Sequence, residues 1–255
     1  MNKLSIIYQD EEVLVVDKPA GLISSKNNTK KDQTLEDLLE EDFNLTFKDG
    51  GLAHRLDKNT SGLLLVARSD ESLFNLQNQF KERKIKKEYL ALVHGVVENS
   101  GRVEGSIGRN PQRHDKFAIM DDGRQALTEY EPIERLQFTG DRLQEIFKDF
   151  NKIQMRKLST NQYNPFTLLR CFPKTGRTHQ IRVHLKYIGH PIVSDEKYVG
   201  RKMYKLDQRW CPRMFLHAKR LGFYHPVSGK WMEFESELPE DLTNCLKLLQ
   251  SNLSS

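Results

Sequence analysis

The sequence predicts a mixed α/β protein, because two kinds of apolar pattern alternate along it. Short continuous apolar runs, such as Val13–Val16 and Leu63–Val66, are typical of buried strands, and disordered chains lack them. Between these runs lie segments whose apolar residues recur at helical spacing. The chain of 255 residues is long enough for one full core, and no internal repeat or Pro/Gly linker divides it. We therefore expect a single domain over residues 1–255.

The first hundred residues contain the clearest strand and helix signals. Residues 12–17 predict a strand that ends in a turn of proline and glycine. Residues 63–68 predict a second strand, which is apolar throughout and so buried. Ser69 can then cap a helix. The apolar residues of this helix share one face: Leu73, Leu76 and Phe80. A further strand is expected over residues 89–93.

The middle of the chain predicts β-hairpins over residues 101–131, with turns at residues 110–111 and 121–123. Basic side chains gather in this segment: Arg109, Arg113, His114, Lys116 and Arg124. The segment is either an RNA-contacting arm or a solvated basic loop, because loops carry both function and idle charge.

Helical spacing returns in two later segments. A helix capped by Asp141 is expected over about residues 141–157. The basic residues at its end either contact RNA or complement the negative end of the helix dipole, and the dipole is the simpler explanation. A second helix is expected over residues 177–189, with Thr178 as its cap and Gly189 ending it in a left-handed conformation. The apolar face of this helix can pack while Arg182 points elsewhere. Arg182 is then either a surface cation or a guanidinium held rigidly in a site.

Composition argues against several classes of protein. The three cysteines are odd in number and far apart, without a Cys-x-x-Cys pair, which disfavours a disulfide scaffold and a zinc ribbon. The first apolar stretch is too short for a signal peptide. No segment approaches the roughly 18 apolar residues of a membrane span. We therefore expect a cytoplasmic protein that does not associate with membranes.

Positive charge is concentrated after residue 50. Residues 1–50 hold six Lys+Arg and eleven Asp+Glu, a net charge of −5. Subtracting these from the totals of 40 and 35 leaves 34 and 24 for residues 51–255, a net charge of +10. A polyanion such as RNA fits this distribution, and on charge alone an unevenly charged surface without a partner fits it equally.

Asp57 lies just before a turn-rich segment, residues 59–62, that leads into the second apolar strand. A strand end of this kind is a frequent place for catalytic groups, because the strand aims the side chain and the loop leaves it accessible. An aspartate flanked by Arg55 and Lys58 is, however, more often an ordinary turn or salt-bridge residue. Spacing alone does not decide between these two roles.

Five motifs resemble the RluA family of pseudouridine synthases, in the family's order and at compatible spacing. The segment 51–67, GLAHRLDKNTSGLLLVA, resembles the family signature throughout its length. The other four are residues 13–22 (VLVVDKPAGL), 87–95 (KEYLALVHG), 174–195 (beginning KTGRTHQIRVHL), and the pair Leu216-His217-Ala218 and His225-Pro226. The resemblance extends over roughly residues 5–243.

This resemblance implies an α+β fold with a long, largely antiparallel central sheet, flanked by helices and loops, and an active-site cleft across its middle. On matching positions it implies that Asp57 is the nucleophile, Tyr89 the aromatic partner of the target base, and Arg182 the cation paired with Asp57. A guanidinium suits that role, since it never deprotonates and typically lowers an aspartate pKa by about 1–3 units. Tyr89 offers a stacking face and a hydroxyl. Its alternative role is ordinary packing at the start of a strand.

The implied reaction breaks the bond from uracil N1 to the sugar, rotates the base, and rejoins it through C5. Nothing is oxidised or hydrolysed, so no cofactor or metal is expected. A stacked base must first be flipped out, at a cost of a few kcal/mol. Arg55 is the family position expected to fill the vacated space, and His54 beside it is either a helper or a structural histidine. RNA contacts are expected from His54, Arg55, Lys58, Arg109, Arg113, Arg177 and His179.

Two features depart from the family pattern. The catalytic motifs begin near residue 13, so we expect no preceding small RNA-binding domain of the kind that many relatives carry. Target choice must then rest on the catalytic domain. The segment of about residues 139–162 is longer than the usual link between its flanking strands, and we expect a helical insertion that borders the RNA.

Two rival functions fit the same scaffold: a non-catalytic RNA-binding protein or folding helper, and a hydrolase that excises bases. The intact set of Asp57, Tyr89 and Arg182 argues against the first rival, and release of free uracil would identify the second. We expect a monomer without a protein partner that acts on ribosomal RNA, transfer RNA or both. The sequence does not identify the RNA or the uridine.

Overall fold

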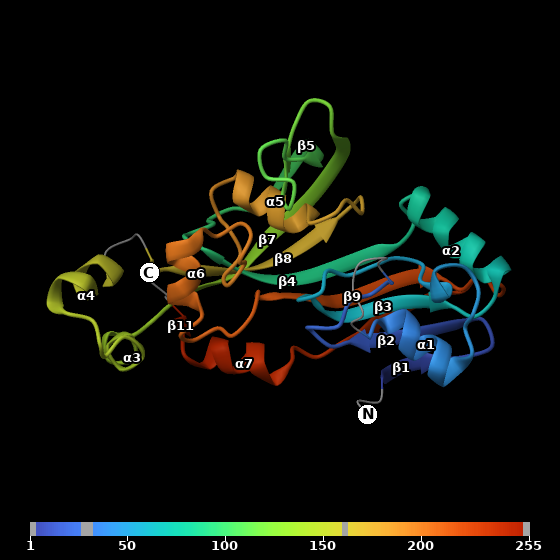
Figure 1. Ribbon diagram of the computed structural model, residues 1–255, viewed down its shortest axis with the longest axis horizontal. Coiled ribbons are helices and arrows are strands. Elements are labelled where there is room, and N and C mark those ends of the chain that lie inside the picture. Colours follow the sequence, from blue (N-terminus) through green and yellow to red (C-terminus); the bar gives the residue numbers. More distant parts are fainter. Residues whose placement is uncertain (1–3, 27–32, 160–162, 252–255) are drawn as a thin grey trace. The chain divides into compact units, whose positions relative to one another are not determined.

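The structure is a computed structural model that describes residues 4–26, 33–159 and 163–251 (Figure 1). The chain divides into two compact units, each formed by two segments. The first unit comprises Met1–Glu88 and His217–Glu237, and the second comprises Tyr89–Leu216 and Leu238–Ser255. The single domain expected from the sequence stays a prediction.

The first unit is a sheet with two α-helices. β1 pairs with β2, β2 with β3 and β10 with β9, all antiparallel, while β3 and β9 pair in parallel through residues 61–62 and 217–218. The strands are β1 (Ser5–Gln9), β2 (Val13–Lys18), β3 (Ser61–Ala67), β9 (Leu216–Tyr224) and β10 (Trp231–Glu235). The helices are α1 (Leu35–Phe43), the short 3-10 helix η1 (Lys48–Gly51) and α2 (Asp70–Lys81).

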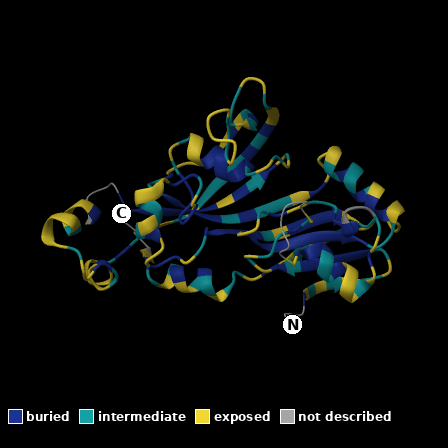
Figure 2. Ribbon diagram, viewed as in Figure 1, coloured by how far each residue is buried: buried dark blue, intermediate teal, exposed yellow. Residues whose placement is uncertain are grey.

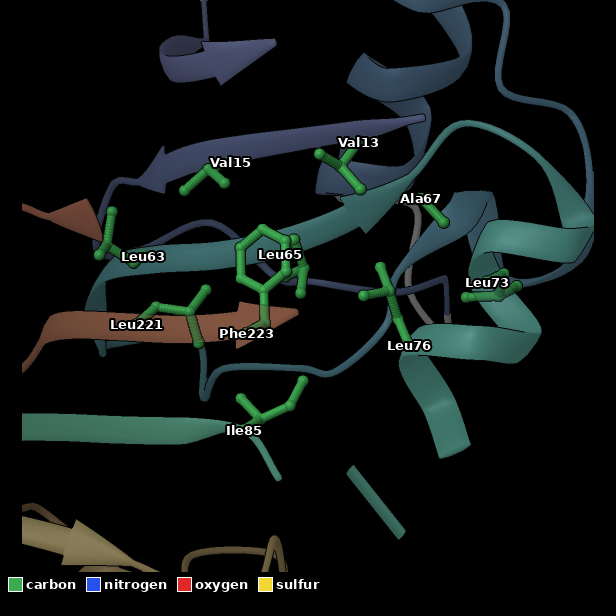
Figure 3. Close-up of a cluster of buried hydrophobic side chains, with 10 residues drawn as sticks. All are labelled: Val13, Val15, Leu63, Leu65, Ala67, Leu73, Leu76, Ile85, Leu221 and Phe223. Atoms are coloured by element: carbon green, nitrogen blue, oxygen red, sulfur yellow. The ribbon is translucent and has the colours of Figure 1, made fainter. Parts of the chain in front are cut away.

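The core of the first unit forms where alternate residues of β2 and β3 meet α2 and β9. Side chains two residues apart on a strand share a face, so this cluster occupies one face of the sheet. Its members are Val13, Val15, Leu63, Leu65, Ala67, Leu73, Leu76, Ile85, Leu221 and Phe223 (Figure 3). The residues between them on β2 and β3 are largely buried as well, so both faces of these strands are covered (Figure 2). The two strands predicted over residues 12–17 and 63–68 are confirmed, as is the burial predicted for the second.

Helix α2 begins as its sequence predicts. The Ser69 hydroxyl accepts a hydrogen bond from the Ser72 N–H at 3.1 Å, which satisfies one of the free N–H groups of the first turn. The buried residues of α2 include Leu73 and Leu76, and Phe80 packs against the same cluster.

The second unit contains an antiparallel sheet in the order β4-β8-β7-β5-β6, with β11 paired to β7. Its strands are β4 (Lys86–His94), β5 (Gly101–Arg109), β6 (Phe117–Ile119), β7 (Arg124–Gln137), β8 (Phe166–Pro173) and β11 (Gln250–Ser251). Its helices are α3 (Gly140–Ile146), α4 (Lys152–Ser159), α5 (Gln180–Tyr187), α6 (Arg201–Asp207) and α7 (Glu240–Lys247). The predicted fold class, mixed α/β with largely antiparallel strands, is confirmed.

The prediction of one helix over residues 141–157 is wrong, because the segment forms α3 and α4 with a break between them. The cap of α3 is Thr139, whose hydroxyl accepts from the Arg142 N–H at 3.3 Å. Asn151 and Gln154 then start the next helix, since each side-chain carbonyl accepts the other residue's backbone N–H, at 2.9 and 2.8 Å. This reciprocal pair is a capping box, which favours a new start over continuation. Residues 160–162 of the predicted insertion lie outside the described residues.

The predicted start of the helix over residues 177–189 is also wrong. Helix α5 begins at Gln180, and His179 before it has a left-handed backbone with φ 56°. No side-chain cap is present, and the Gln180 side chain instead holds the turn before the helix: its carbonyl accepts from the Arg177 N–H at 3.0 Å, and its amide donates to the Leu127 carbonyl at 3.0 Å. The expected left-handed residue at the end of the helix, Gly189, is confirmed with φ 87°.

Candidate functional site

Asp57 lies on a tight turn of the first unit, immediately before β3. The Thr60 N–H donates to the Asp57 carbonyl at 3.0 Å and closes the turn, and the Asp57 side chain is half-buried. Ser24 fixes the residue before it, since its hydroxyl donates to the Leu56 carbonyl at 2.8 Å and accepts from the Leu56 N–H at 3.2 Å. The backbone that carries Asp57 is therefore held on both sides.

Lys18 anchors the other side of this turn. Its side chain is fully buried, and its ammonium donates to the carbonyls of Pro19, Leu22 and Lys58 at 2.9, 2.8 and 3.3 Å. The Gly21 N–H also donates to the Lys58 carbonyl, at 2.8 Å. A buried ammonium needs hydrogen-bond acceptors to offset its lost hydration. Lys18 therefore ties the end of β2 to the residue that follows Asp57.

A buried polar chain supports the start of β3. Ser61 Oγ lies 3.0 Å from His217 Nδ1, and His217 Nε2 lies 3.3 Å from the Ser236 carbonyl oxygen. Because a carbonyl only accepts, Nε2 carries the proton and Nδ1 accepts from the Ser61 hydroxyl. The Ser236 hydroxyl in turn donates to Asp17 Oδ2 at 2.7 Å. This series of hydrogen bonds begins at Ser61, four residues after Asp57, and so holds the start of β3 in place.

His54 has a structural contact in the first unit. Its Nε2 accepts a hydrogen bond from the Leu65 N–H at 3.1 Å, and its ring centroid lies 4.9 Å from that of Phe80. Burial, with a smaller contribution from Lys87, lowers the pKa of His54 from 6.5 to about 3. The imidazole is therefore neutral near pH 7 and offers no charge to a phosphate, which favours the structural alternative for this residue.

Arg55 and Lys58 flank Asp57 and are both exposed. An Arg55 guanidinium nitrogen lies 3.4 Å from the Ser25 hydroxyl, which it reaches across the exposed surface of the loop. Two exposed cations beside one half-buried carboxylate suit a polyanionic substrate.

Arg182, in the second unit, is buried on α5 and held by Asp195. Its Nε and Nη2 atoms donate to the two Asp195 carboxylate oxygens, each at 2.8 Å, and Asp195 is fully buried. The guanidinium carbon also lies 5.1 Å from the ring centroid of Tyr198. A two-pronged ion pair and an aromatic face fix the plane of a guanidinium. Of the two alternatives for Arg182, burial disfavours the surface cation, and its pairing with Asp57 stays a prediction.

Tyr89 lies in β4, where it pairs with Cys171 of β8, and only 9% of its surface is exposed. Because side chains alternate between the two faces of a sheet, the strand sets the face on which the Tyr89 ring lies. Its role toward the target base stays a prediction.

The basic arm, defined as residues 109–117, connects β5 to β6 in the second unit. Arg109 and Arg113 are exposed along it, and the Arg109 guanidinium carbon lies 5.5 Å from the ring centroid of Phe117. Arg177 lies outside the arm, where its Nε donates to the Gln125 carbonyl of β7 at 3.1 Å.

The structure brings two of the predicted residues of the second unit, His179 and Arg182, into contact with Tyr198. His179 Nδ1 lies 2.8 Å from the Tyr198 hydroxyl, and the His179 ring meets the edge of Phe117. Sequence reasoning did not single out Tyr198. The available signal was its position three residues after Asp195, in the segment that follows the fourth motif.

Comparison with known proteins agrees with this arrangement of motifs. Residues 12–187 match the family model described as RNA pseudouridylate synthase. This chain belongs to the RNA pseudouridylate synthase family. It is 35% identical over 255 residues to an uncharacterised RNA pseudouridine synthase of Bacillus subtilis, covering 98% of this chain and 74% of the relative. It is 34% identical over 261 residues to the ribosomal large subunit pseudouridine synthase D of Pseudomonas aeruginosa, covering 98% and 73%.

Solved structures support the same assignment. Human RNA pseudouridylate synthase domain containing 1 is similar with a TM-score of 0.71 and 28% identity, covering 98% of this chain and 89% of that one. Human RNA pseudouridylate synthase domain containing 4 shares the fold, with a TM-score of 0.67 and 22% identity, over 96% and 94% of the two chains. This family member is an isomerase that acts on RNA, and the non-catalytic alternative is not favoured. Over the described ranges, no helix is both long enough and apolar enough to cross a membrane.

Proposed function

We propose that this synthase isomerises uridines of ribosomal RNA, with Asp57 as the nucleophile, Arg182 as the catalytic cation and Tyr89 as the partner of the target base. The observation that carries the proposal is the support of Asp57: the turn is closed by Thr60 and tied down by Lys18. A nucleophile works best when surrounding contacts fix its direction before substrate arrives.

The proposed chemistry conserves all atoms of the substrate. The Asp57 carboxylate attacks the uridine and forms a bond to it, and the bond between uracil N1 and the sugar breaks. The base rotates and C5 bonds to the sugar, and the bond to Asp57 breaks, which regenerates the carboxylate. The proton on C5 leaves to solvent while N1 gains one. Tyr89 offers a flat face for the base and a hydroxyl for this proton movement. Arg182 offers a permanent cation whose plane is set by Asp195.

RNA contacts are proposed for the exposed cations on both units. Arg55 is proposed to fill the space vacated by the flipped base, with Lys58 on the neighbouring phosphates. Arg109, Arg113 and Arg177 are proposed to contact the backbone, since guanidinium groups bind phosphate with two parallel hydrogen bonds. His54 and His179 are proposed to support the fold and not to contact RNA directly. His54 Nε2 already accepts from the Leu65 N–H, and His179 Nδ1 already contacts the Tyr198 hydroxyl.

The α3–α4 segment is proposed to border the RNA. Helix α4 contributes exposed basic residues, with Arg156 and Lys157 in its last turn. Arg209 anchors the segment: its guanidinium nitrogens bind the two carboxylate oxygens of Asp149, and its carbon lies 4.8 Å from the Phe150 ring centroid. Replacing Arg156 and Lys157 by Gln leaves this anchor intact, and we expect weaker RNA binding. Unchanged affinity and activity would remove the idea.

The function is tested by incubating RNA that carries labelled uridine with the protein and separating the nucleosides. Pseudouridine is the expected product, free uracil would identify a hydrolase, and unchanged uridine a binding protein. Asp57→Asn is expected to abolish isomerisation and to leave RNA affinity within a few-fold. Asp121→Asn, in the exposed turn between β6 and β7, is the matched control and should retain full activity. Substantial turnover by Asp57→Asn would remove the nucleophile assignment.

The substrate class is the finer part of the proposal. It rests on relatives named ribosomal large subunit pseudouridine synthase D in three bacteria. Ribosomal RNA fragments and transfer RNA transcripts, offered together at equal concentration, should give pseudouridine in the ribosomal fragments first. Preferential modification of transfer RNA would redirect the assignment.

A further inference from the structure

The turn Asp195–Tyr198 holds Arg182 at one end. Asp195 binds the Arg182 guanidinium with both carboxylate oxygens. The same carboxylate accepts from the Lys197 N–H at 3.1 Å, and the Tyr198 N–H donates to the Asp195 carbonyl at 3.1 Å. One buried carboxylate therefore contacts both the backbone of this turn and Arg182.

The other end of the turn holds the basic arm. The Tyr198 hydroxyl accepts the Phe117 N–H at 2.9 Å, and Lys197 Nζ donates to the Asp115 carbonyl at 2.8 Å. Tyr198 is only 7% exposed and packs in a buried cluster with Ile107 of β5. One side chain thus contacts the arm through its hydroxyl and Arg182 through its ring.

His179 adds a second contact to the same hydroxyl. It precedes the helix that carries Arg182 and has a φ of 56°, a left-handed conformation that is uncommon for a residue other than glycine. Such a conformation persists where surrounding contacts over-determine it. Here these contacts are the hydroxyl of Tyr198 and the ring of Phe117, both on the path to the arm.

We propose that the Tyr198 hydroxyl is a positioning group that couples the basic arm to Arg182, so that RNA held by the arm orients the guanidinium for catalysis. This inference rests on the proposed function of Arg182. The arm offers exposed cations for phosphates, and its connection to Arg182 runs through the buried Tyr198, with two defined hydrogen bonds at its hydroxyl oxygen. A catalytic group misplaced by a fraction of an ångström loses much of its effect.

Tyr198→Phe isolates the hydroxyl. The variant keeps the ring next to Arg182 and in the buried cluster, and it leaves the Phe117 N–H without its partner. The matched control is Tyr187→Phe, which removes a hydroxyl from a residue of α5 that is 66% exposed. Circular dichroism melting curves check that both variants fold.

The measured quantities are the single-turnover rate of pseudouridine formation with excess enzyme and the dissociation constant for the same RNA. We expect Tyr198→Phe to slow the single-turnover step by roughly tenfold and to change the dissociation constant by less than about twofold. Tyr187→Phe should match the wild-type protein in both. A wild-type single-turnover rate in Tyr198→Phe overturns the proposal. If Tyr198→Phe does not fold, Lys197→Met removes the second link to the arm and is judged by the same criteria.

A double-mutant cycle with Arg109→Ala tests the coupling itself. In the wild-type background, Arg109→Ala should weaken RNA binding and slow the single-turnover step. In the Tyr198→Phe background it should still weaken binding, without slowing that step further. Equal slowing in both backgrounds, or none in either, contradicts the coupling.

Amide hydrogen exchange separates this inference from the proposed function. RNA should slow exchange across residues 195–198 in the wild-type protein and leave it unchanged in Tyr198→Phe. If the wild-type protein makes no pseudouridine, the proposed function fails, and the exchange data still decide whether the arm and the turn are coupled. Identical exchange responses in the two proteins overturn the coupling.

Discussion

At the scale of single residues, Lys18 shows how a buried charge can serve a site without taking part in its chemistry. Its ammonium is fully buried and binds three carbonyls, one of which belongs to the residue after Asp57. Dehydrating an ammonium is costly, so its position is stable only while all these acceptors stay in place. The Asp57 turn gains rigidity from this requirement.

Replacing Lys18 by Met should lower the free energy of unfolding by about 3 kcal/mol, because carbonyls that the ammonium satisfied lose their partner inside the protein. Denaturant titration measures this loss. Lys81→Met is the matched control at an exposed lysine in the last turn of α2, with an expected change within about 0.5 kcal/mol. Equal stability of the two variants would contradict the anchoring role of Lys18.

His54 should make stability depend on acid pH. Its folded pKa of about 3 lies below its ordinary value of 6.5, so between these values the unfolded chain binds a proton that the folded chain does not. This contribution to stability is therefore complete above pH 6.5 and declines as the pH falls toward 3. His54→Gln keeps an acceptor for the Leu65 N–H and cannot be protonated.

The wild-type melting temperature should therefore fall more between pH 7.5 and pH 4.5 than that of His54→Gln. For a chain of this size each kcal/mol corresponds to roughly 2–4 °C. Scanning calorimetry at the two pH values measures the difference. Parallel decreases in the two proteins would mean that His54 does not titrate as described.

At the scale of elements, sequence patterns correctly predicted the features that depend on interactions between neighbouring residues. The apolar runs of β2 and β3 and the Ser69 cap of α2 are confirmed, since strand burial and capping depend on adjacent residues. The start of α5 was mispredicted because a long-range contact holds the residues there: the Gln180 amide donates to the Leu127 carbonyl, more than fifty residues away in sequence. Tyr198 and the anchoring role of Lys18 were missed for the same reason, since Phe117 and Lys58, the partners that matter, are distant in sequence.

The predicted roles of Asp57, Tyr89 and Arg182 came from motif resemblance. A single aspartate before a turn is consistent with many roles, so the residues alone left the question open. The structure adds the local supports of these side chains, namely the Asp57 turn, the pairing of β4 with β8 and the Arg182–Asp195 ion pair.

Gly62 shows why the junction of β3 and β9 tolerates no side chain. Its φ is 109°, and a Cβ built there would lie 2.3 Å from the Ala218 carbonyl oxygen. Gly62→Ala therefore combines backbone strain with a collision against a backbone that cannot move aside. We expect a loss of at least about 2 kcal/mol in unfolding free energy, measured in urea.

Gly140→Ala is the matched control for Gly62→Ala, because Gly140 has no atom within 4 Å of a built Cβ. It is the first residue of α3, where alanine is the better helix former. The expected change is neutral or slightly stabilising. A similar loss at both glycines would mean that the contact between β3 and β9 is looser than described.

At the scale of the whole molecule, the distribution of charge suits an RNA substrate. The net charge of +10 lies in residues 51–255, whereas residues 1–50 carry −5. Exposed arginines of the basic arm and of the Asp57 loop belong to the positive part. Binding that depends on phosphates releases counterions, so its strength should fall steeply with salt.

The logarithm of the RNA association constant should therefore decrease linearly with the logarithm of salt concentration. Each phosphate contact contributes a slope of roughly 0.7 to 0.9. Arg113→Ala, on the basic arm, should reduce the magnitude of the slope by about 1, since it removes one proposed phosphate contact.

Arg220→Ala is the matched control, because two glutamates of β10, Glu233 and Glu235, already lie 3.8 and 3.3 Å from that guanidinium. The slope for Arg220→Ala should equal that of the wild-type protein. Filter binding at four salt concentrations measures the slopes of the wild-type protein and of both variants. If Arg113→Ala changes affinity without changing the slope, the arm contacts RNA through something other than phosphate charge, and Arg113 loses its proposed role.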